Sequence, residues 1–265
     1  MADGISIGVA WTGAAAFVRR EKKLLAPLVL ALMVLPVTVS QLVQPTNPFA
    51  SSGGIKPWMV IAIISLLAGL VGQMAISRLA MGWEASLGAA LRLAARRLPT
   101  TVAAFILFFL CVGLVVIPLT MVLMIAGGGA DRASAGSGAA NAMTLLAIFA
   151  AVPRIMLSPV IAMNESTGPW GLVKRSWRAS RGQYWRLLGF FIMVLIASLI
   201  LAIAASSVVG SLAALLIGPS NPLTISRLLV ALTGGMVQAV IATIYAAMIG
   251  RIVAQLARGR PTSGM

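Results

Sequence analysis

Chemically reactive side chains are scarce in this chain. Its 265 residues include no histidine, five acidic residues and a single cysteine, Cys111. Because histidine is the commonest general base and metal ligand, its absence argues against most hydrolytic and metal-dependent sites. A lone cysteine cannot form an intramolecular disulfide, so we expect Cys111 to be a small apolar packing residue. The sequence therefore predicts no catalytic residue, no metal ligand and no cofactor.

The few carboxylates are also poorly placed for catalysis. Asp3 lies in the N-terminal tail, Glu21 lies among four cations, and Asp131 lies in a glycine-rich segment. Glu84 and Glu165 could act together, but no nucleophile motif, phosphate-binding lysine motif or metal cluster accompanies them. We therefore expect a protein that is not an enzyme.

Apolar residues dominate what remains. Hydrophobic side chains make up 60% of the sequence and charged ones 9%, far from the composition of a soluble domain. A helix needs roughly 20 apolar residues to cross a bilayer. Six stretches have that length: Leu24–Val43, Trp58–Ser77, Thr101–Ile125, Ala142–Met163, Leu187–Ala213 and Leu228–Gly250. The pattern predicts an all-α, polytopic transmembrane helical bundle with six spans, forming one integral membrane domain over residues 1–265.

Positive charge gathers in every second gap between these stretches. The chain has 20 Lys and Arg residues against five acids, and the N-terminal, second, fourth and C-terminal non-spanning segments hold most of them. These are Arg19, Arg20, Lys22, Lys23, Arg78, Arg92, Arg96, Arg97, Lys174, Arg175, Arg178, Arg181, Arg186, Arg251, Arg258 and Arg260. By the positive-inside rule both termini are cytoplasmic, which agrees with an even number of spans.

The segment before the first span predicts an interfacial helix. Ile5–Val18 is apolar but too short to span, and it ends in a basic cluster. We expect Trp11 and Phe17 to anchor it at the membrane surface. The apolar run after the cluster is too long for a signal peptide and has no cleavage pattern, so we expect the first span to stay in the mature protein.

Two of the basic gaps have amphipathic helical spacing. Leu87, Leu91 and Leu98 share one face of the first, and Trp170, Val173 and Trp177 share one face of the second. We predict two basic helices lying flat at the cytoplasmic surface. An offset of 82 residues also aligns Arg92 with Lys174 and Arg96 with Arg178, so 58–125 and 142–213 form a weak internal repeat, either a duplication or a consequence of topology.

Small residues form stripes on two of the spans. Ser65, Gly69 and Gly72 make one stripe, and the other runs along the last span. The second consists of Ala231, Gly235, Gln238, Ala242, Ala246 and Gly250. Small side chains let helices approach closely in lipid, so both stripes predict helix packing. Gln73 and Gln238 either form hydrogen bonds between helices or line a polar path.

Arg154 is the least ordinary residue of the spans. A charge there costs roughly 2.5–3.5 kcal/mol on insertion scales, so it needs a partner or water. Glu165 reaches it only if the helix breaks at Pro159, and Glu84 is a second candidate partner. Pro159 also leaves a backbone acceptor free near the guanidinium. We interpret Arg154, Glu165 and Glu84 either as a structural clamp or as a site for an anionic headgroup or solute.

The segment 174–186, KRSWRASRGQYWR, interleaves basic and aromatic residues. Such a pattern can stack single-stranded nucleic acid. Beside two spans it more simply predicts contact with anionic lipid, with the aromatic side chains at headgroup level. The predicted lipid-surface residues are Lys174, Arg175, Trp177, Arg178, Arg181, Trp185 and Arg186, and we expect no nucleic-acid partner.

The same region resembles a known family. The order Arg154, Pro159, Glu165, Gly168, Ser176-Trp177-Arg178, Arg181-Gly182 and Trp185-Arg186 is similar to the membrane domain of some bacterial glycerophosphodiester phosphodiesterases and of stand-alone six-helix proteins. The resemblance extends over about Ile5 to Leu256, with 154–186 its distinctive part. It implies a multi-pass protein of the bacterial inner membrane. It carries over no catalytic residue, because the catalytic part of those enzymes is a separate soluble barrel.

Two functions remain open on the sequence. The first is a non-catalytic membrane protein that organises anionic lipid, or docks a partner, through its basic surface helices. The second is a transporter of a small solute or lipid headgroup, with Arg154 in an intramembrane site. The partners expected are membrane lipids; a protein partner and the oligomeric state stay open.

Overall fold

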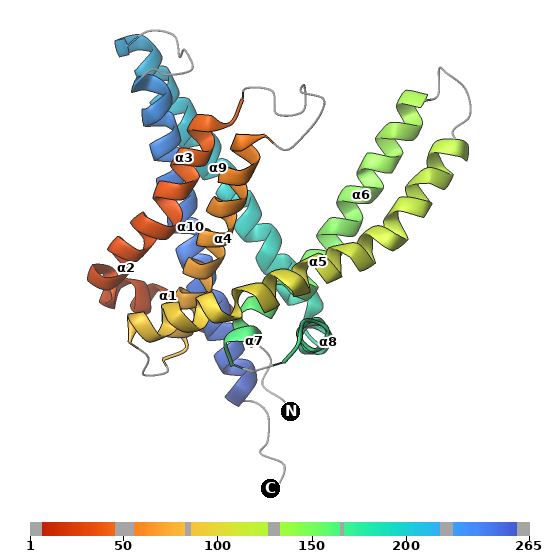
Figure 1. Ribbon diagram of the computed structural model, residues 1–265, viewed down its shortest axis with the longest axis horizontal. Coiled ribbons are helices and arrows are strands. Elements are labelled where there is room, and N and C mark those ends of the chain that lie inside the picture. Colours follow the sequence, from red (N-terminus) through yellow and green to blue (C-terminus); the bar gives the residue numbers. More distant parts are fainter. Residues whose placement is uncertain are drawn as a thin grey trace, which may run out of the picture. The chain divides into compact units, whose positions relative to one another are not determined.

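The computed structural model describes residues 7–45, 56–82, 86–126, 133–164, 167–217 and 225–258, and within these ranges it holds helices and no strand. The helices are α1 (Ile7–Arg20), α2 (Lys22–Val29), the π-helix η1 (Leu30–Val34), α3 (Leu35–Val43), α4 (Pro57–Ala80), α5 (Leu87–Ala126), α6 (Ala133–Ile155), α7 (Ser158–Asn164), α8 (Pro169–Ser180), α9 (Tyr184–Ile217) and α10 (Ile225–Arg258) (Figure 1). The predicted all-α class is confirmed.

Six helical stretches are long and apolar enough to cross a bilayer. They are Lys22–Val43, Pro57–Ala80, Leu87–Val122, Ala142–Asn164, Tyr184–Ala213 and Ile225–Gln255. Each contains most of one predicted span, so the predicted number and order of spans are confirmed. The chain is a multi-pass membrane protein, while the side on which its termini lie stays a prediction.

The chain divides into two compact units. The first comprises Met1–Leu98 and Ile192–Met265, and the second comprises Pro99–Phe191. The boundaries fall inside α5, at Pro99, and inside α9. Neither boundary coincides with an end of the weak repeat, so the repeat and the single domain stay predictions.

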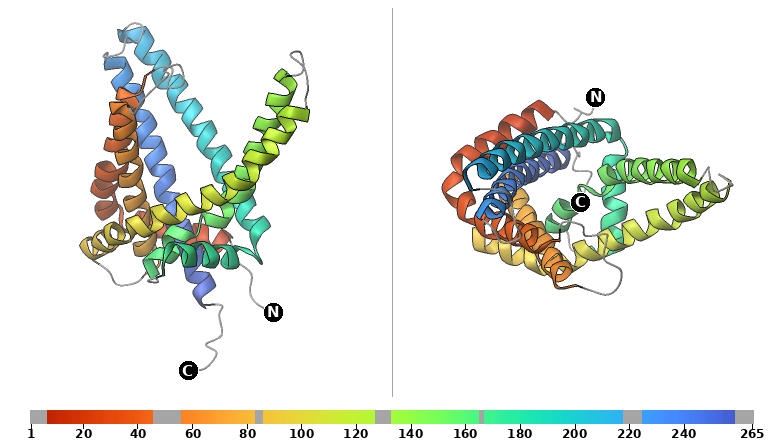
Figure 2. Two further views of the ribbon diagram at one scale, coloured as in Figure 1. Left: turned by 45° about the vertical axis from the view of Figure 1, so that its right-hand side comes forward. Right: turned by 90° about the horizontal axis from the view of Figure 1, so that it is seen from above.

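Helix α10 is the centre of the first unit, where it packs against α4, α3, η1 and α1. The α4–α10 contact is close in both views of Figure 2, where the orange and blue helices lie side by side. Ser77 Oγ donates a hydrogen bond of 3.0 Å to the Ala246 carbonyl, and an added Cβ at Gly250 would collide with the Ser77 carbonyl oxygen. Ala246 and Gly250 of the longer stripe therefore sit at a helix contact, as predicted, and so does Gly72 of the shorter one, whereas an added Cβ at Gly69 would meet no atom within 4 Å.

Helix α1 packs against other helices more extensively than the sequence suggested. Ala10, Ala14 and Phe17 are buried on one face, and α1 packs against α10. Trp11 is 50% exposed, in keeping with a membrane-surface position. The prediction that Phe17 anchors α1 in the interface was wrong: its ring is 5% exposed, because the spacing of these three residues turns it toward α10.

The surface helix predicted over Leu87–Leu98 is not a separate element. It continues through Pro99 into the third span as the 40-residue helix α5. A proline removes one backbone donor, so at Pro99 a single turn loses its hydrogen bond while the helix resumes on both sides. The first span contains a π-helix instead: η1 ends at Val34, two residues before Pro36, and its wider turn accommodates one extra residue.

In the second unit the fourth span breaks just before Pro159. Helix α6 ends at Ile155, and α7 begins at Ser158, so Pro159 lies in the first turn of α7, where a missing backbone donor has no cost. Ile155, Leu157 and Val160 are almost fully buried and form the core of this turn together with Leu172 of α8. Helix α8 packs against α6 and α7 as a result.

Candidate functional site

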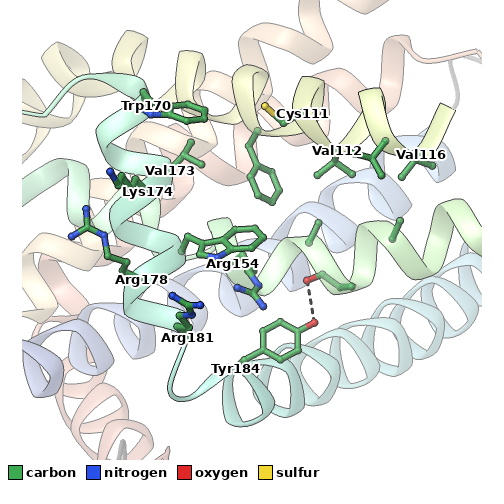
Figure 3. A pocket seen from close by; sticks show the side chains of 16 residues that line it. Cys111, Val112, Val116, Arg154, Trp170, Val173, Lys174, Arg178, Arg181 and Tyr184 are labelled. Atoms are coloured by element: carbon green, nitrogen blue, oxygen red, sulfur yellow. Dashed lines mark hydrogen bonds between the residues drawn. The ribbon is translucent and has the colours of Figure 1, made fainter. Parts of the chain in front are cut away.

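A cavity of about 950 Å³ lies in the second unit, between α5, α6 and α8. Figure 3 shows the side chains that line it. They are Phe108, Cys111, Val112, Val115 and Val116 of α5, Ala147, Ala150, Ala151 and Arg154 of α6, Trp170, Val173, Lys174, Trp177 and Arg178 of α8, Arg181, and Tyr184 at the start of α9. The lining thus combines cations, aromatic rings and an apolar wall.

Arg154 lies between two aromatic rings at one end of this cavity. Its guanidinium carbon is 3.9 Å from the centre of the Trp177 ring and 4.9 Å from that of Tyr184. Each such cation–π contact contributes about 0.5–2 kcal/mol, more as the cation is desolvated. The two rings therefore offset a large part of the cost of a charge within a span.

Backbone hydrogen bonds hold this arrangement in place. Tyr184 Oη donates a hydrogen bond of 3.0 Å to the carbonyl of Ala150 in α6, which is the dashed line in Figure 3. The buried hydroxyl of Ser176 donates to the carbonyl of Arg154 itself. Because α6 ends one residue later, that carbonyl has lost its helical partner and the serine supplies one. Helix α8 is thereby fixed at the residue that carries the charge.

The face of α8 opposite the cavity explains its orientation. Leu172, Ser176 and Ser180 are fully buried, while Trp170 and Trp177 are more than two-fifths exposed. In Figure 3, Trp170 and Val173 point into the cavity from α8, whereas the Arg178 guanidinium points away from Arg154. The aromatic face that the sequence assigned to the membrane surface therefore forms one wall of the cavity.

Four cations line the cavity: Arg154, Lys174, Arg178 and Arg181. Of the five acidic residues in the sequence, Glu21 is the one that the described ranges include, and it forms an ion pair of 2.8 Å with Arg20. Within those same ranges the Arg154 guanidinium donates no hydrogen bond, so no described residue occupies its five N–H groups, and they can bind an anion.

The opposite wall is apolar and open. Val112 and Val116 of α5 line it together with three alanines of α6, whose short side chains leave room. Cys111 lies on this wall and is exposed. A cavity that is cationic at one end and apolar along its side matches the two parts of an anionic amphiphile.

The predicted site residues fall into three groups. Arg154, Lys174, Trp177, Arg178 and Arg181 line the cavity. Trp185 is 79% exposed, and it lies with Arg175 and Arg186 outside the lining. Glu84 and Glu165 lie outside the described residues, so their pairing with Arg154 stays a prediction.

Sequence reasoning missed the wall formed by α5 and α6 and the position of Tyr184 over Arg154. The pairing of Tyr184 with Arg154 could not be found from spacing, because it depends on the turns at either end of α8. The described ranges contain no group of three side chains that could hold a metal ion. The arrangement can bind an anion, but it presents no nucleophile beside a base.

A family model described as Domain of unknown function (DUF7847) matches residues 5–256. No curated protein and no solved structure matches the chain significantly. The resemblance to the membrane domain of glycerophosphodiester phosphodiesterases was wrong, because the family found over nearly the whole chain is a different one. Basic and aromatic residues between two spans recur wherever a helix lies on anionic lipid, which makes such a resemblance weakly specific.

Proposed function

The chain belongs to the DUF7847 family, and we propose that it is a non-catalytic membrane protein that binds an anionic membrane lipid in the cavity of its second unit. The headgroup lies against Arg154 and Arg181, and an acyl chain lies along the wall formed by α5 and α6. The observation that carries the proposal is the Arg154 guanidinium, held between Trp177 and Tyr184 with its donors unused by the described residues.

The chemistry of the guanidinium supports a phosphate-bearing headgroup. Arginine binds phosphate through two parallel charge-assisted hydrogen bonds, and it is weakly hydrated enough to sit at low polarity. The rings on either side fix the plane of the guanidinium without neutralising it. A carboxylate in place of the two rings would neutralise the Arg154 charge, and the guanidinium would then attract an anionic ligand less.

The position of α8 supports lipid as the source of that anion. Lys174 and Arg178 add positive charge at the cavity, and each cation near an anionic leaflet contributes about 1 kcal/mol. The positive-inside pattern favours the cytoplasmic surface for α8, where anionic lipid is concentrated. We propose the bacterial inner membrane as the location; the charge pattern supports insertion from the cytoplasmic side.

Native mass spectrometry of the purified protein with phosphatidylglycerol or phosphatidylcholine tests this function. We expect retention of phosphatidylglycerol by the wild-type chain and at least tenfold weaker retention by Arg154→Gln, since a hydrogen bond to a charged group contributes about 1.5–3 kcal/mol. Arg19→Gln is the matched control, because it removes one exposed cation outside the cavity.

Equal retention of phosphatidylglycerol by Arg154→Gln and Arg19→Gln would contradict binding in the cavity. It would instead indicate a general attraction between the anionic lipid and the basic protein surface. Equal retention of the two lipids by the wild-type chain would contradict recognition of the anionic headgroup. Transport is the competing function of the same residues, and it predicts in addition that lipid or solute crosses a vesicle membrane containing the protein.

A further inference from the structure

A second cavity, of about 360 Å³, lies in the first unit between α3, α4 and α10. These three helices pack against one another, and they are the orange-red, orange and blue helices on the left of Figure 1 and of each view in Figure 2. The cavity is lined by Met33, Val37, Ser40, Gln41, Ala62, Ser65, Leu66, Gly69, Leu70, Gln73, Gln238, Ala239 and Ala242. No ionisable side chain is among them.

Three primary amides face this space, one from each helix: Gln41 of α3, Gln73 of α4 and Gln238 of α10. Within the described residues none of these side chains forms a hydrogen bond with protein. Gln41 and Gln73 are half-buried and Gln238 is exposed, and an amide left unpaired where it is shielded from water costs about 1–3 kcal/mol. Three of them around one cavity point to a polar guest that satisfies them.

The packing around the cavity shows that it is not a loosely packed region. Ser65 Oγ donates a hydrogen bond of 2.7 Å to the carbonyl of Pro36, and this bond joins α4 to α3. An added Cβ at Gly72 would lie 3.1 Å from Met33 Cε, and one at Gly235 would lie 2.8 Å from Thr38 Oγ1. The three helices therefore touch closely on either side of a space that small residues leave open.

Gly69 shows where the space lies. An added Cβ there would meet no atom within 4 Å, in contrast to Gly72 one turn further along the same helix. Gln41 and Gln238 also line a neighbouring cavity of about 630 Å³ between α9 and α10, so these two amides have open space beside them in the first unit.

We infer that the cavity between α3, α4 and α10 binds an uncharged, hydrogen-bonding guest within the membrane. Amides supply both donors and acceptors, and none of the described lining residues carries a charge that would neutralise an ion, which favours an uncharged guest. One water needs about 10–15 Å³ of accessible cavity volume. A cavity of about 360 Å³ can therefore hold a cluster of waters or a small polyol. The inference concerns other residues than Arg154 and does not depend on the proposed lipid site.

Thiol labelling of the full chain tests this site. In a Cys111→Ala background, Gly69→Cys places a thiol in the cavity, and Ile64→Cys places one on the same helix at a side chain that is 59% exposed on the apolar surface. A water-soluble methanethiosulfonate reagent reacts with the thiolate, which needs water around it. In reconstituted membranes we expect Gly69→Cys to react at least tenfold faster than Ile64→Cys.

Removing the amides supplies the second measurement. With Gln41→Leu, Gln73→Leu and Gln238→Leu added, the lining loses its three amides and no longer satisfies a polar guest, and labelling at Gly69→Cys should fall at least fivefold. Ala62→Cys, also in the lining, replaces Gly69→Cys if that variant does not fold. Equal rates at the cavity thiol and at Ile64→Cys would overturn the inference, and so would fast labelling that persists in the leucine variants.

The identity of the guest follows from the same assay. Protection of Gly69→Cys by 1 M glycerol, but not by 1 M sucrose, identifies a small polyol. Fast labelling that neither solute slows identifies water. Both results support an uncharged polar guest, and neither is affected by Arg154→Gln, so the two sites of the protein are tested separately.

Discussion

Arg154 has its positive charge stabilised by rings rather than by a described carboxylate. The contacts to Trp177 and Tyr184 are within 5 Å, a range in which the quadrupole of an aromatic ring attracts a cation. Together they contribute an amount comparable to the cost of roughly 2.5–3.5 kcal/mol for an arginine in a span. The charge can therefore be kept within the bundle and still be available to a ligand.

A double-mutant cycle measures this stabilisation. We expect Arg154→Gln and Trp177→Leu, combined, to destabilise the protein by less than the sum of the two single changes, with a coupling of about 0.5–2 kcal/mol. The midpoints of thermal unfolding in a fixed lipid mixture compare each single variant and the double variant with the wild-type protein.

Trp11→Leu supplies the control for that cycle, because its side chain is 50% exposed on α1 and its ring is not one of those that contact Arg154. Its coupling to Arg154→Gln should lie below about 0.5 kcal/mol, the usual range for independent sites. Additive effects of Arg154→Gln and Trp177→Leu would show that the observed stacking contributes nothing to stability.

Part of this site was visible in the sequence. Arg154 stood out because a charge interrupts an apolar span, and Pro159 indicated the break that lets the chain turn back. The partners of Arg154 were less predictable, since the sequence offered carboxylates as the stronger electrostatic choice. Trp177 reaches the guanidinium because Ser176 and Leu172 are buried against α6 and α7, which is a consequence of tertiary packing.

The contact between α4 and α10 depends on the absence of one side chain. Gly250 lies against the backbone of Ser77, and the hydrogen bond from Ser77 Oγ to the Ala246 carbonyl lies one turn away. Backbone atoms cannot move aside as a flexible side chain can. Close approach and a hydrogen bond between helices therefore reinforce each other at this crossing.

Replacing Gly250 with alanine should separate these helices. The new Cβ would collide with the Ser77 carbonyl oxygen, so we expect Gly250→Ala to destabilise the protein by about 1–3 kcal/mol, as overpacking does. Thermal unfolding of the reconstituted protein measures the effect.

Gly189→Ala is the matched control, since Gly189 lies within α9 and an added Cβ there would meet no atom within 4 Å. Alanine favours a helix by about 1 kcal/mol over glycine, so Gly189→Ala should be neutral or stabilising. A Gly250→Ala variant that unfolds with the same midpoint as Gly189→Ala would contradict the close contact.

Helices were easier to predict than their surroundings. Apolar length and the basic flanks located all six spans, because the bilayer imposes both. Hydrophobicity did not distinguish a side chain that faces lipid from one that faces protein, which is why Phe17 was assigned to the interface. Nor did Pro99 end a helix, since the residues on both sides favour helix strongly enough for α5 to continue.

Both units expose large apolar side chains along their spans. Leu66 is 71% exposed and Leu215 is 82% exposed in the first unit, and Leu114 is 73% exposed in the second. Such surfaces would aggregate in water, and they need acyl chains to cover them. The units are therefore membrane-embedded individually, each with a cavity of a different character: cationic and apolar in one, uncharged and polar in the other.

The orientation of the chain decides what the cationic cavity meets. The basic residues of 174–186 favour the cytoplasmic side, whereas Ala135 lies in a segment with little charge that the same rule puts outside. Fusions truncated after Ala135 and after Arg175 should report opposite compartments: active alkaline phosphatase after Ala135 and a fluorescent cytoplasmic reporter after Arg175. Reporters in the same compartment would contradict the predicted topology, and an Arg175 fusion outside the cell would remove α8 from the anionic leaflet on which the proposed lipid site depends.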